Sequence, residues 1–410
     1  MRRLVALALG IVLAIPGVGR AHPEGDLTRY VDPSIGTLGA GFVFPGPAAP
    51  YGMVQLSPDT NGYFAYTGYQ YIDAKIRGFG HVHTEAMGVP EGGEIPFMPE
   101  VGSIVTDVRA YEQPFSHATE HAEPGYYSVL LGNGVGVELT AGQRVGLHRY
   151  TFPPAAESSV IVDAGRVISD ADPDQHLDRP PGYARAHLDV VDARTLVGTT
   201  YGNDYTVHFA ARFDHDFVPA LWSSPAGVPD PSVSDVDAVG AGAVLSFGAS
   251  AGTVVAEVGI SFVSENNAFA NLHAEMKGSA LRFDAIRAHT RAAWNQALHA
   301  IVVEGGTLDQ KRAFYTALYH AQHHPNVFND ANGDYLGYDG GVHNIAEPPL
   351  NGSPYYANYS LWDTYRAEMP LLELIAPDRV RDMMRSLAAI VEQGHRLPRW
   401  GWMNRYADFM

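Results

Sequence analysis

The chain has 410 residues, 46% of them hydrophobic and 11% aromatic, so two to three domains with large packed cores are expected and wholesale disorder is excluded. Its 27 Lys and Arg face 45 Asp and Glu, and the net charge of −18 argues against a protein that binds nucleic acid through its charge. Because there is no cysteine, disulfides, thiolate metal sites and cysteine nucleophiles are excluded as well.

Residues 1–21 have the pattern of a secretory signal peptide. Two arginines at positions 2 and 3 precede an apolar run over 4–18, and small residues then stand on both sides of Arg20. No later stretch is long and apolar enough to span a bilayer. We therefore predict a secreted or periplasmic protein without a membrane span.

Residues 22–266 are predicted to form a β-sandwich domain. Alternation is clearest over 206–213, where Val207, Phe209 and every second residue after them point to one side. The segment 126–140 is typical of two strands joined at Asn133-Gly134, a pair favoured in two-residue hairpin turns. Further short strands are expected at 158–162, 195–200, 243–247 and 253–263. Many short strands without intervening helices favour two packed antiparallel sheets.

Within this domain, the loop 77–99 is the stretch richest in chemically active side chains. It holds His81, His83, Glu85, Glu91 and Glu94. A His-x-His pair on a strand places both imidazoles on one face, which is one way to hold zinc. The pair alone is weak evidence, and histidines that are structural or contact a substrate are the more probable interpretation.

The hydrophobic period changes near residue 267. Residues 267–300 favour helix and are predicted as a helical linker, and 308–324 continue the helical composition. The clearest helix spans 377–393, with Pro377 in its first turn, Gly394 as its C-terminal cap, and one apolar stripe that contains Val380, Met383, Met384, Leu387, Ile390 and Val391. Residues 301–410 are therefore predicted to begin an all-helical domain.

The turn Asp330-Ala331-Asn332-Gly333-Asp334 resembles the opening of a calcium loop. Gly341 stands where such a loop needs a glutamate, so a turn rich in Asp and Asn side-chain contacts is the favoured interpretation.

The segment 358–366 places Trp362 and Asp363 at the start of a helix. Sugar sites combine a flat aromatic face with a carboxylate that accepts hydroxyl hydrogen bonds, and these two residues offer both. Trp400 and Trp402 lie in a similar loop after the next helix. Equally, Asp363 could stabilise a helix N-terminus while Trp362 packs inside.

Six segments in order resemble glycoside hydrolase family 92, the calcium-dependent exo-acting α-mannosidases. They are VDPSIGTLGAGFVFPGPAAPYGMVQLSPDT (31–60), GYQYIDAKIRGFGHVHTEAMG (68–88), HAEPGYYSVLL (121–131), ELTAGQRVGLHRYTFP (138–153), AFYTALYHAQHHPNVFND (313–330) and NYSLWDTYRAEMPLLELIAPDRV (358–380). The resemblance implies a β-sandwich N-terminal domain followed by an all-α (α/α)6 barrel, of which this chain would hold the start, with the sugar bound where the two meet.

The resemblance also implies the activity: removal of terminal mannose from α-mannoside glycans by an inverting mechanism, with calcium on the sugar hydroxyls. The family's general acid, its general base and most of its calcium ligands lie beyond the point that matches Met410, so no catalytic residue is expected within this chain and the chain alone is expected to be inactive. Asp363, in the matched Trp-Asp-Thr motif, is implied as a sugar ligand, with Trp362 beside it. His81 and His83 are implied to approach the site from the sandwich side. The metal ligands stay unassigned.

Two alternatives remain at this stage. One is a non-catalytic carbohydrate-binding β-sandwich protein. The other is a metallohydrolase that uses His81, His83 and Glu85. The loop after His83 also departs from the Ser-Gly-Thr-Gly run that is common in the family, so its contacts with substrate are expected to differ.

An incomplete barrel would also leave apolar side chains without partners. We therefore expect uncovered faces on the helix at 377–393, at residues such as Val380, Met383, Leu387 and Val391.

Overall fold

The computed structural model describes residues 25–407, except 63–64, 86–87, 89, 155–156, 169–181, 203–204, 250 and 277–281. The predicted signal peptide, residues 1–21, lies outside the described residues. Among the helices of the described part, none has the length and apolar character needed to cross a membrane.

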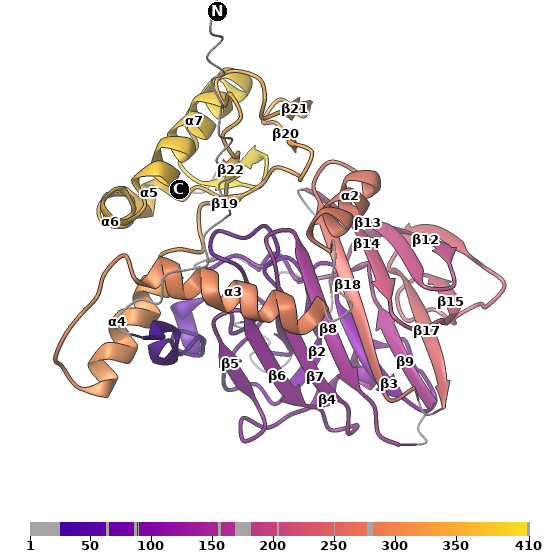
Figure 1. Cartoon of the computed structure of the whole chain (residues 1–410). Coiled ribbons are helices and arrows are strands. Elements are labelled where there is room, and N and C mark those ends of the chain that lie inside the picture. The colour runs from indigo at the N-terminus through magenta and orange to yellow at the C-terminus, as the bar shows by residue number, and fades with distance from the viewer. Residues whose placement is uncertain are drawn as a thin grey trace, which may run out of the picture.

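Two large antiparallel sheets make up most of the molecule, and Figure 1 shows their strands one behind the other. The nine-stranded sheet runs in the order β16 (Asp235–Val239), β12 (Arg185–Asp192), β13 (Thr195–Tyr201), β14 (Thr206–Phe213), β18 (Thr253–Ser261), β8 (Val145–Thr151), β7 (Gly136–Ala141), β6 (Tyr126–Leu130) and β5 (His121–Glu123). The seven-stranded sheet runs in the order β1 (Ser57–Thr60), β2 (Lys75–Gly80), β3 (Phe97–Val101), β9 (Glu157–Val162), β17 (Ala241–Ala249) and β15 (Val218–Ser223), and β4 (Gln113–Pro114) pairs with β2.

The remaining elements are short ribbons and helices. The ribbons pair β10 (Arg166–Val167) with β11 (Gly182–Tyr183), β19 (Asn326–Val327) with β22 (Tyr356–Ala357), β20 (Asp334–Leu336) with β21 (Val342–Asn344), and β23 (Gly401–Trp402) with β24 (Arg405–Tyr406). The helices are η1 (Leu27–Tyr30), η2 (Gly39–Gly41), α1 (Val108–Tyr111), α2 (Glu265–Glu275), α3 (Arg282–Leu298), α4 (Leu308–His320), α5 (Leu361–Thr364), α6 (Glu368–Ile375) and α7 (Pro377–Gly394).

The alternation predicted for 206–213 is confirmed in β14. Val207 and Phe209 are buried, and Thr206 and His208 on the other side are half-buried. Ala210 is also buried, because α2 packs on that side of β14. The other predicted strands correspond to β9, β13, β17 and β18.

The predicted hairpin forms between β6 and β7, but its turn differs from the prediction. The Leu131 N–H donates to the Val135 carbonyl at 3.0 Å, so three residues form the loop rather than two. Of these three, only Gly134 adopts a positive φ, 84°. A three-residue loop needs one left-handed residue, whereas a two-residue type I′ turn needs two, and Asn133 is not left-handed.

The two sheets share one hydrophobic core, so they form a sandwich. Phe97 of β3 and Phe213 of β14 stack with their ring centroids 6.2 Å apart, which joins the two layers directly. The same core continues into the helical part through Phe328, Tyr359 and Met383. Sheets and helices are therefore held together by continuous apolar packing.

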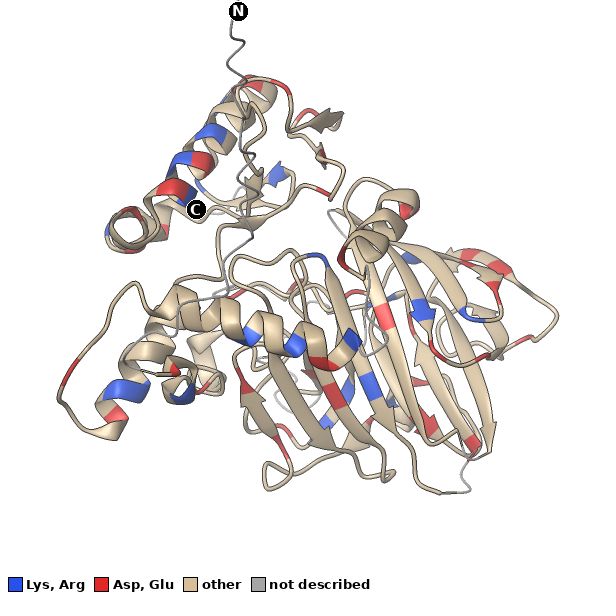
Figure 2. Cartoon of the chain, in the orientation of Figure 1, with Lys and Arg blue, Asp and Glu red and all other residues tan. Residues whose placement is uncertain are grey.

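Helix α7 follows its predicted bounds closely. Met383 and Leu387 are 0% and 7% exposed, so the prediction that their faces would be uncovered is wrong for these two residues. Met384, predicted in the stripe, is 45% exposed instead. Residues of both charge signs are spread along α7, as Figure 2 shows. The left-handed cap is His395, with φ of 63°, and not Gly394, which is the last helical residue.

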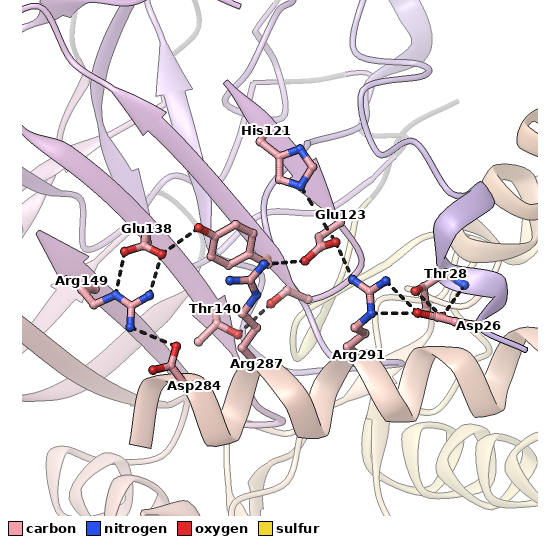
Figure 3. A network of polar contacts seen from close by, with 12 residues as sticks. Asp26, Thr28, His121, Glu123, Glu138, Thr140, Arg149, Asp284, Arg287 and Arg291 are labelled. Atoms are coloured by element: carbon pink, nitrogen blue, oxygen red, sulfur yellow. Dashed lines mark hydrogen bonds and ion pairs between the residues drawn. The ribbon is translucent and has the colours of Figure 1, made fainter. Parts of the chain in front are cut away.

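Helix α3 is fastened to the nine-stranded sheet by arginine–carboxylate pairs (Figure 3). Arg287 lies 2.8 Å from Glu123 of β5. Arg291 pairs with Glu123 as well, and it lies 2.7 Å from Asp26, the residue just before η1. The chain start, the sheet edge and the first long helix are thus tied at one place. Such partly exposed pairs contribute modestly one by one and set orientation more than stability.

The turn at 330–334 is rich in Asp and Asn contacts, as predicted. Asp330 is 1% exposed, and its carboxylate accepts hydrogen bonds from Ser261, Asn267 and Asn271 at 2.6–2.8 Å. Donors from the protein thus occupy the carboxylate oxygens that would bind the ion in a calcium loop.

The helical region after residue 300 pairs α6 with α7 and α3 with α4. These contacts do not establish the (α/α)6 arrangement, so the barrel remains a prediction, as do the domain boundaries at 266, 300 and 410.

Candidate functional site

A cavity of about 760 Å³ lies between the loop after β2, the C-terminal end of α4, helix α5 and the loop before β23. The polar residues that line it include Thr84, Glu85, His320, His324, Asn358, Ser360, Asp363, Thr364, Glu368 and Trp400. Trp402 contributes an aromatic wall. Sandwich loop and helices thus form one site, which is where the resemblance led us to expect the sugar.

A larger cavity, about 1150 Å³, lies between α3 and the start of α7. It contains none of the predicted site residues. Its buried carboxylate, Glu275, already accepts the backbone N–H groups of Gln143 and Arg144 at 3.0 and 2.8 Å. The smaller cavity is therefore the better candidate for the functional site.

Asp363 lines the cavity from helix α5. Its Oδ2 accepts the Ser360 hydroxyl at 2.6 Å and the Trp400 indole N–H at 2.8 Å. The carboxylate makes no cap to the backbone at the start of α5, so helix capping is not its role in this structure. Instead, Asp363 holds the Trp400 ring at the cavity wall.

The two predicted aromatic residues have different positions. Trp362 is 50% exposed and is not among the residues that line the cavity, whereas Trp400 lines it. The two rings lie 6.1 Å apart at 48°. Trp402 also faces the cavity, and within the described part of the chain its buried indole nitrogen has no hydrogen-bond partner. Flat aromatic surfaces next to a carboxylate suit the apolar face and the hydroxyls of a pyranose.

His81 lies inside the sandwich, outside the cavity. Its Nδ1 donates to the Ile95 carbonyl at 2.7 Å, and its Nε2 accepts from His148 Nε2 at 3.0 Å. Burial lowers the pKa of His81 to about 3, so the ring is neutral. Both nitrogens are therefore occupied, and no lone pair is available for a metal. Gly146 makes room for this ring, since a Cβ there would lie 2.9 Å from His81.

His83 is equally buried. Its Nδ1 faces the Gln55 carbonyl at 2.7 Å and its Nε2 faces the Asp59 carboxylate at 2.9 Å. Both ring nitrogens are therefore engaged by neighbouring protein groups. His81 and His83 thus support the loop that carries Glu85 and do not line the cavity. The trio His81, His83 and Glu85 of the metallohydrolase alternative is not assembled.

Glu85 instead meets histidines from the other side of the site. His320 Nδ1 and His323 Nδ1 lie 2.7 and 2.6 Å from its Oε1. Burial opposes ionisation of Glu85, but the two imidazoles outweigh it and hold the pKa of this carboxyl well below its usual range. The same carboxylate raises the pKa of His320 against the effect of burial. An ion pair between sandwich loop and α4 results.

Glu368, at the start of α6, is the other carboxyl with a displaced pKa. Burial, followed by the negative charge of Glu85, raises the pKa of Glu368 to about 7. Near neutral pH it therefore exists in both protonation states, and it can donate or accept a hydrogen bond in the cavity.

Sequence reasoning missed His320, His323 and Glu368 as site residues. The first two lie in the matched segment 313–330, whose close spacing of histidines was the available signal. No sequence motif marked Glu368 as a site residue. Glu85 and His320 are 235 positions apart, so only the fold brings them together.

Family models match both parts of the chain. Residues 30–261 match the glycosyl hydrolase family 92 N-terminal domain, and residues 267–410 match the glycosyl hydrolase family 92 catalytic domain. An uncharacterised secreted glycosidase of Arthroderma benhamiae is 28% identical over 387 residues, which cover 88% of this chain and 47% of that protein.

Solved structures agree with this assignment. A family GH92 α-mannosidase from Bacteroides thetaiotaomicron, also solved in complex with mannoimidazole, superposes with a TM-score of 0.83 at 29% identity, over 94% of this chain and 52% of its own in the ligand-free structure. A family GH92 inverting mannosidase from the same organism gives 0.81 at 26% identity, over 94% and 51%. The chain spans about half the length of these relatives. It belongs to glycosyl hydrolase family 92.

Proposed function

We propose that this chain forms part of a secreted α-mannosidase that removes terminal α-linked mannose with inversion of configuration. The observation that carries the proposal is the cavity in which the Asp363 carboxylate holds the Trp400 indole at 2.8 Å. Family membership and the likeness to α-mannosidases, one of them described as inverting, support the reaction class.

In this proposal, the chain's own residues bind and orient the sugar. Asp363 accepts hydrogen bonds from sugar hydroxyls, and Trp400 covers the apolar face of the ring. Inversion needs a carboxylic acid that protonates the leaving oxygen and a separate carboxylate that activates water. The resemblance places both in family segments that have no match in this chain, so we assign neither role to a residue here, and we propose that the chain alone does not release mannose.

Calcium, which the resemblance implies, would add a hard Lewis acid next to the sugar hydroxyls. Calcium takes six to eight oxygen ligands. The described cavity residues offer three carboxylates, Glu85, Asp363 and Glu368, and the hydroxyls of Thr84, Ser360 and Thr364. Glu85 is already paired with two histidines, and the other groups do not form a recognisable calcium shell by themselves. We keep calcium as a proposal for the enzyme as a whole and derive no step through it.

Secretion is proposed from the pattern of residues 1–21 and from the secreted relative in Arthroderma benhamiae. The alternative of a sandwich protein that lost its catalytic part is disfavoured, because residues 267–410 match the family's catalytic domain.

The test is product stereochemistry. The enzyme that contains this chain is incubated with an α-mannoside, and proton NMR follows the first product. We expect β-mannose to form first, activity to disappear in the calcium-selective chelator EGTA, and activity to return with calcium. Initial α-mannose would refute inversion, and full activity in excess EGTA would refute the calcium requirement. No hydrolysis of any α-mannoside would refute the assignment itself.

A further inference from the structure

Glu85, His320 and His323 converge at one edge of the cavity. Their ligand atoms, one from each side chain, all lie within 4.8 Å of one another. Glu85 comes from the loop after β2, His320 is the last residue of α4, and His323 lies in the turn that follows. Glu85 and His320 also line the cavity, so this group is accessible from it.

The surroundings orient the two imidazoles for coordination. His320 Nε2 lies 3.2 Å from the Ile35 carbonyl, which accepts its N–H, and Nδ1 faces Glu85 at 2.7 Å, so a metal ion would take the place of the proton on Nδ1. A metal-bound histidine usually donates its other N–H to such a carbonyl. His323 is fully buried and stacks on Phe44, with ring centroids 5.6 Å apart, so the orientation of its imidazole ring is fixed as well.

His323 gives an independent indication that a ligand is missing between these groups. Its Nδ1 lies 2.6 Å from Glu85 Oε1 in a close contact without hydrogen-bond geometry, and its Nε2 has no hydrogen-bond partner among the described residues. A fully buried imidazole whose nitrogens lack well-directed hydrogen bonds is costly. Coordination of Nδ1 to a cation would remove part of that cost.

We propose that Glu85, His320 and His323 bind one divalent transition-metal ion of the zinc class, with a fourth position open to the cavity. Two imidazoles and one carboxylate are a donor set that zinc accepts, and three protein ligands leave room for a water. Calcium prefers oxygen ligands throughout, so this site differs from the proposed calcium site. The site does not depend on the proposed mannosidase activity.

The two contacts with Glu85 require only a small adjustment. Bonds of about 2.0–2.1 Å in a tetrahedral arrangement place ligand atoms roughly 3.3 Å apart. The present contacts of 2.6 and 2.7 Å to Glu85 Oε1 therefore need to open by about 0.6 Å. Asp363 and Glu368 line the same cavity, and their carboxylates add negative potential that favours a cation.

The experiment measures metal binding and needs no activity. Protein without a polyhistidine tag is stripped with chelator and titrated with zinc by calorimetry, and its metal content is then determined. We expect one zinc per chain, and cobalt in its place should show the visible absorption of a four-coordinate ion. Glu85→Gln and His320→Gln should each weaken zinc binding at least tenfold, whereas His215→Gln, at an exposed position outside the cavity, should leave it unchanged.

Thermal unfolding supplies a second measurement. Zinc in large excess over its dissociation constant should raise the melting temperature of the unaltered protein, but not that of His320→Gln. Absence of stoichiometric zinc in the unaltered protein would overturn the proposal. Equal zinc affinity in Glu85→Gln, His320→Gln and the unaltered protein would overturn it too, and would show that the three residues form an ion-paired cluster only. If a variant fails to fold, the titration and the cobalt spectrum of the unaltered protein decide.

Discussion

The Asp363 carboxylate accepts a hydroxyl and an indole N–H at the cavity wall, and we propose that its charge serves ligand binding rather than folding. A charge-assisted hydrogen bond to a sugar hydroxyl contributes about 1.5–3 kcal/mol. We expect Asp363→Asn, in the enzyme that contains this chain, to lower kcat/KM by roughly tenfold to a hundredfold, since about 1.4 kcal/mol corresponds to tenfold. The melting temperature should hardly change. Kinetics on an aryl α-mannoside and a thermal melt measure both.

Asp378→Asn is the matched control, because Asp378 lies in the first turn of α7 but outside this cavity. It should leave kcat/KM unchanged. If Asp363→Asn instead lowers stability strongly while the folded enzyme keeps its normal activity, Asp363 has a structural role and the proposed sugar contact is wrong.

Glu94 is a buried carboxyl whose protonation makes the stability of the fold depend on pH. It is 2% exposed, and burial outweighs the nearby Tyr205 hydroxyl and raises the pKa of Glu94 to about 7. The folded state then binds the proton more tightly than the unfolded state, so the free energy of unfolding falls as pH rises from about 4.5 to about 7. Above that pH range, the ionised Glu94 lowers the free energy of unfolding by its full amount, of the order of 3 kcal/mol.

Glu94→Gln removes this titration while keeping the size of the side chain. We expect the variant to melt at a higher temperature than the unaltered protein at pH 8, and to show little or no gain at pH 4. Thermal unfolding at both pH values measures the difference. An equal shift at both would mean that Glu94 does not titrate between them.

The packing of whole elements leads to the next prediction. Helix α2 lies so close to β18 that a Cβ on Gly259 would come within 2.4 Å of the Ala268 carbonyl oxygen. The contact is with backbone, so the helix itself would have to move. We expect Gly259→Ala to lower the free energy of unfolding by about 1–3 kcal/mol, measured by denaturant titration.

Gly136 of β7 is the control within the same sheet. An added Cβ there meets nothing closer than 3.7 Å. Gly136→Ala should therefore leave stability within about 0.5 kcal/mol. Equal stability of both variants would contradict the close contact between α2 and β18.

Strands such as β14 could be predicted from the sequence because each has one face in the core. The alternation of apolar and polar residues along the strand shows that face directly. The three-residue turn at Gly134 could not, since the same Asn-Gly pair fits both loop lengths. Met384 was misassigned because a stripe of apolar residues does not show which neighbours will cover it. His81 and His83 were recognised as a pair, but their burial depends on partners such as His148 and Asp59 that only the fold supplies.

At the scale of the molecule, apolar packing joins the sheets to the helices. Trp294 of α3 belongs to a smaller cluster beside the main core: its indole N–H donates to the Ala48 carbonyl at 2.7 Å, and its ring packs on Tyr319 of α4 at 4.3 Å. The main core also runs without a break from Phe97 in the sandwich to Met383 in α7. Apolar packing of this extent couples the unfolding of the parts it joins.

We therefore expect this chain to unfold in a single calorimetric transition, with sheets and helices melting together. Trp294→Phe should lower the midpoint of that transition, because it leaves the Ala48 carbonyl without its donor and opens a void among Tyr319 and His323. The loss should be about 2–4 kcal/mol, and it should affect both parts alike, as reported by the sheet and helix signals in circular dichroism. Two separated transitions, or a protease-resistant core that ends between residues 265 and 300, would show that the sandwich folds independently of the helices that complete the site.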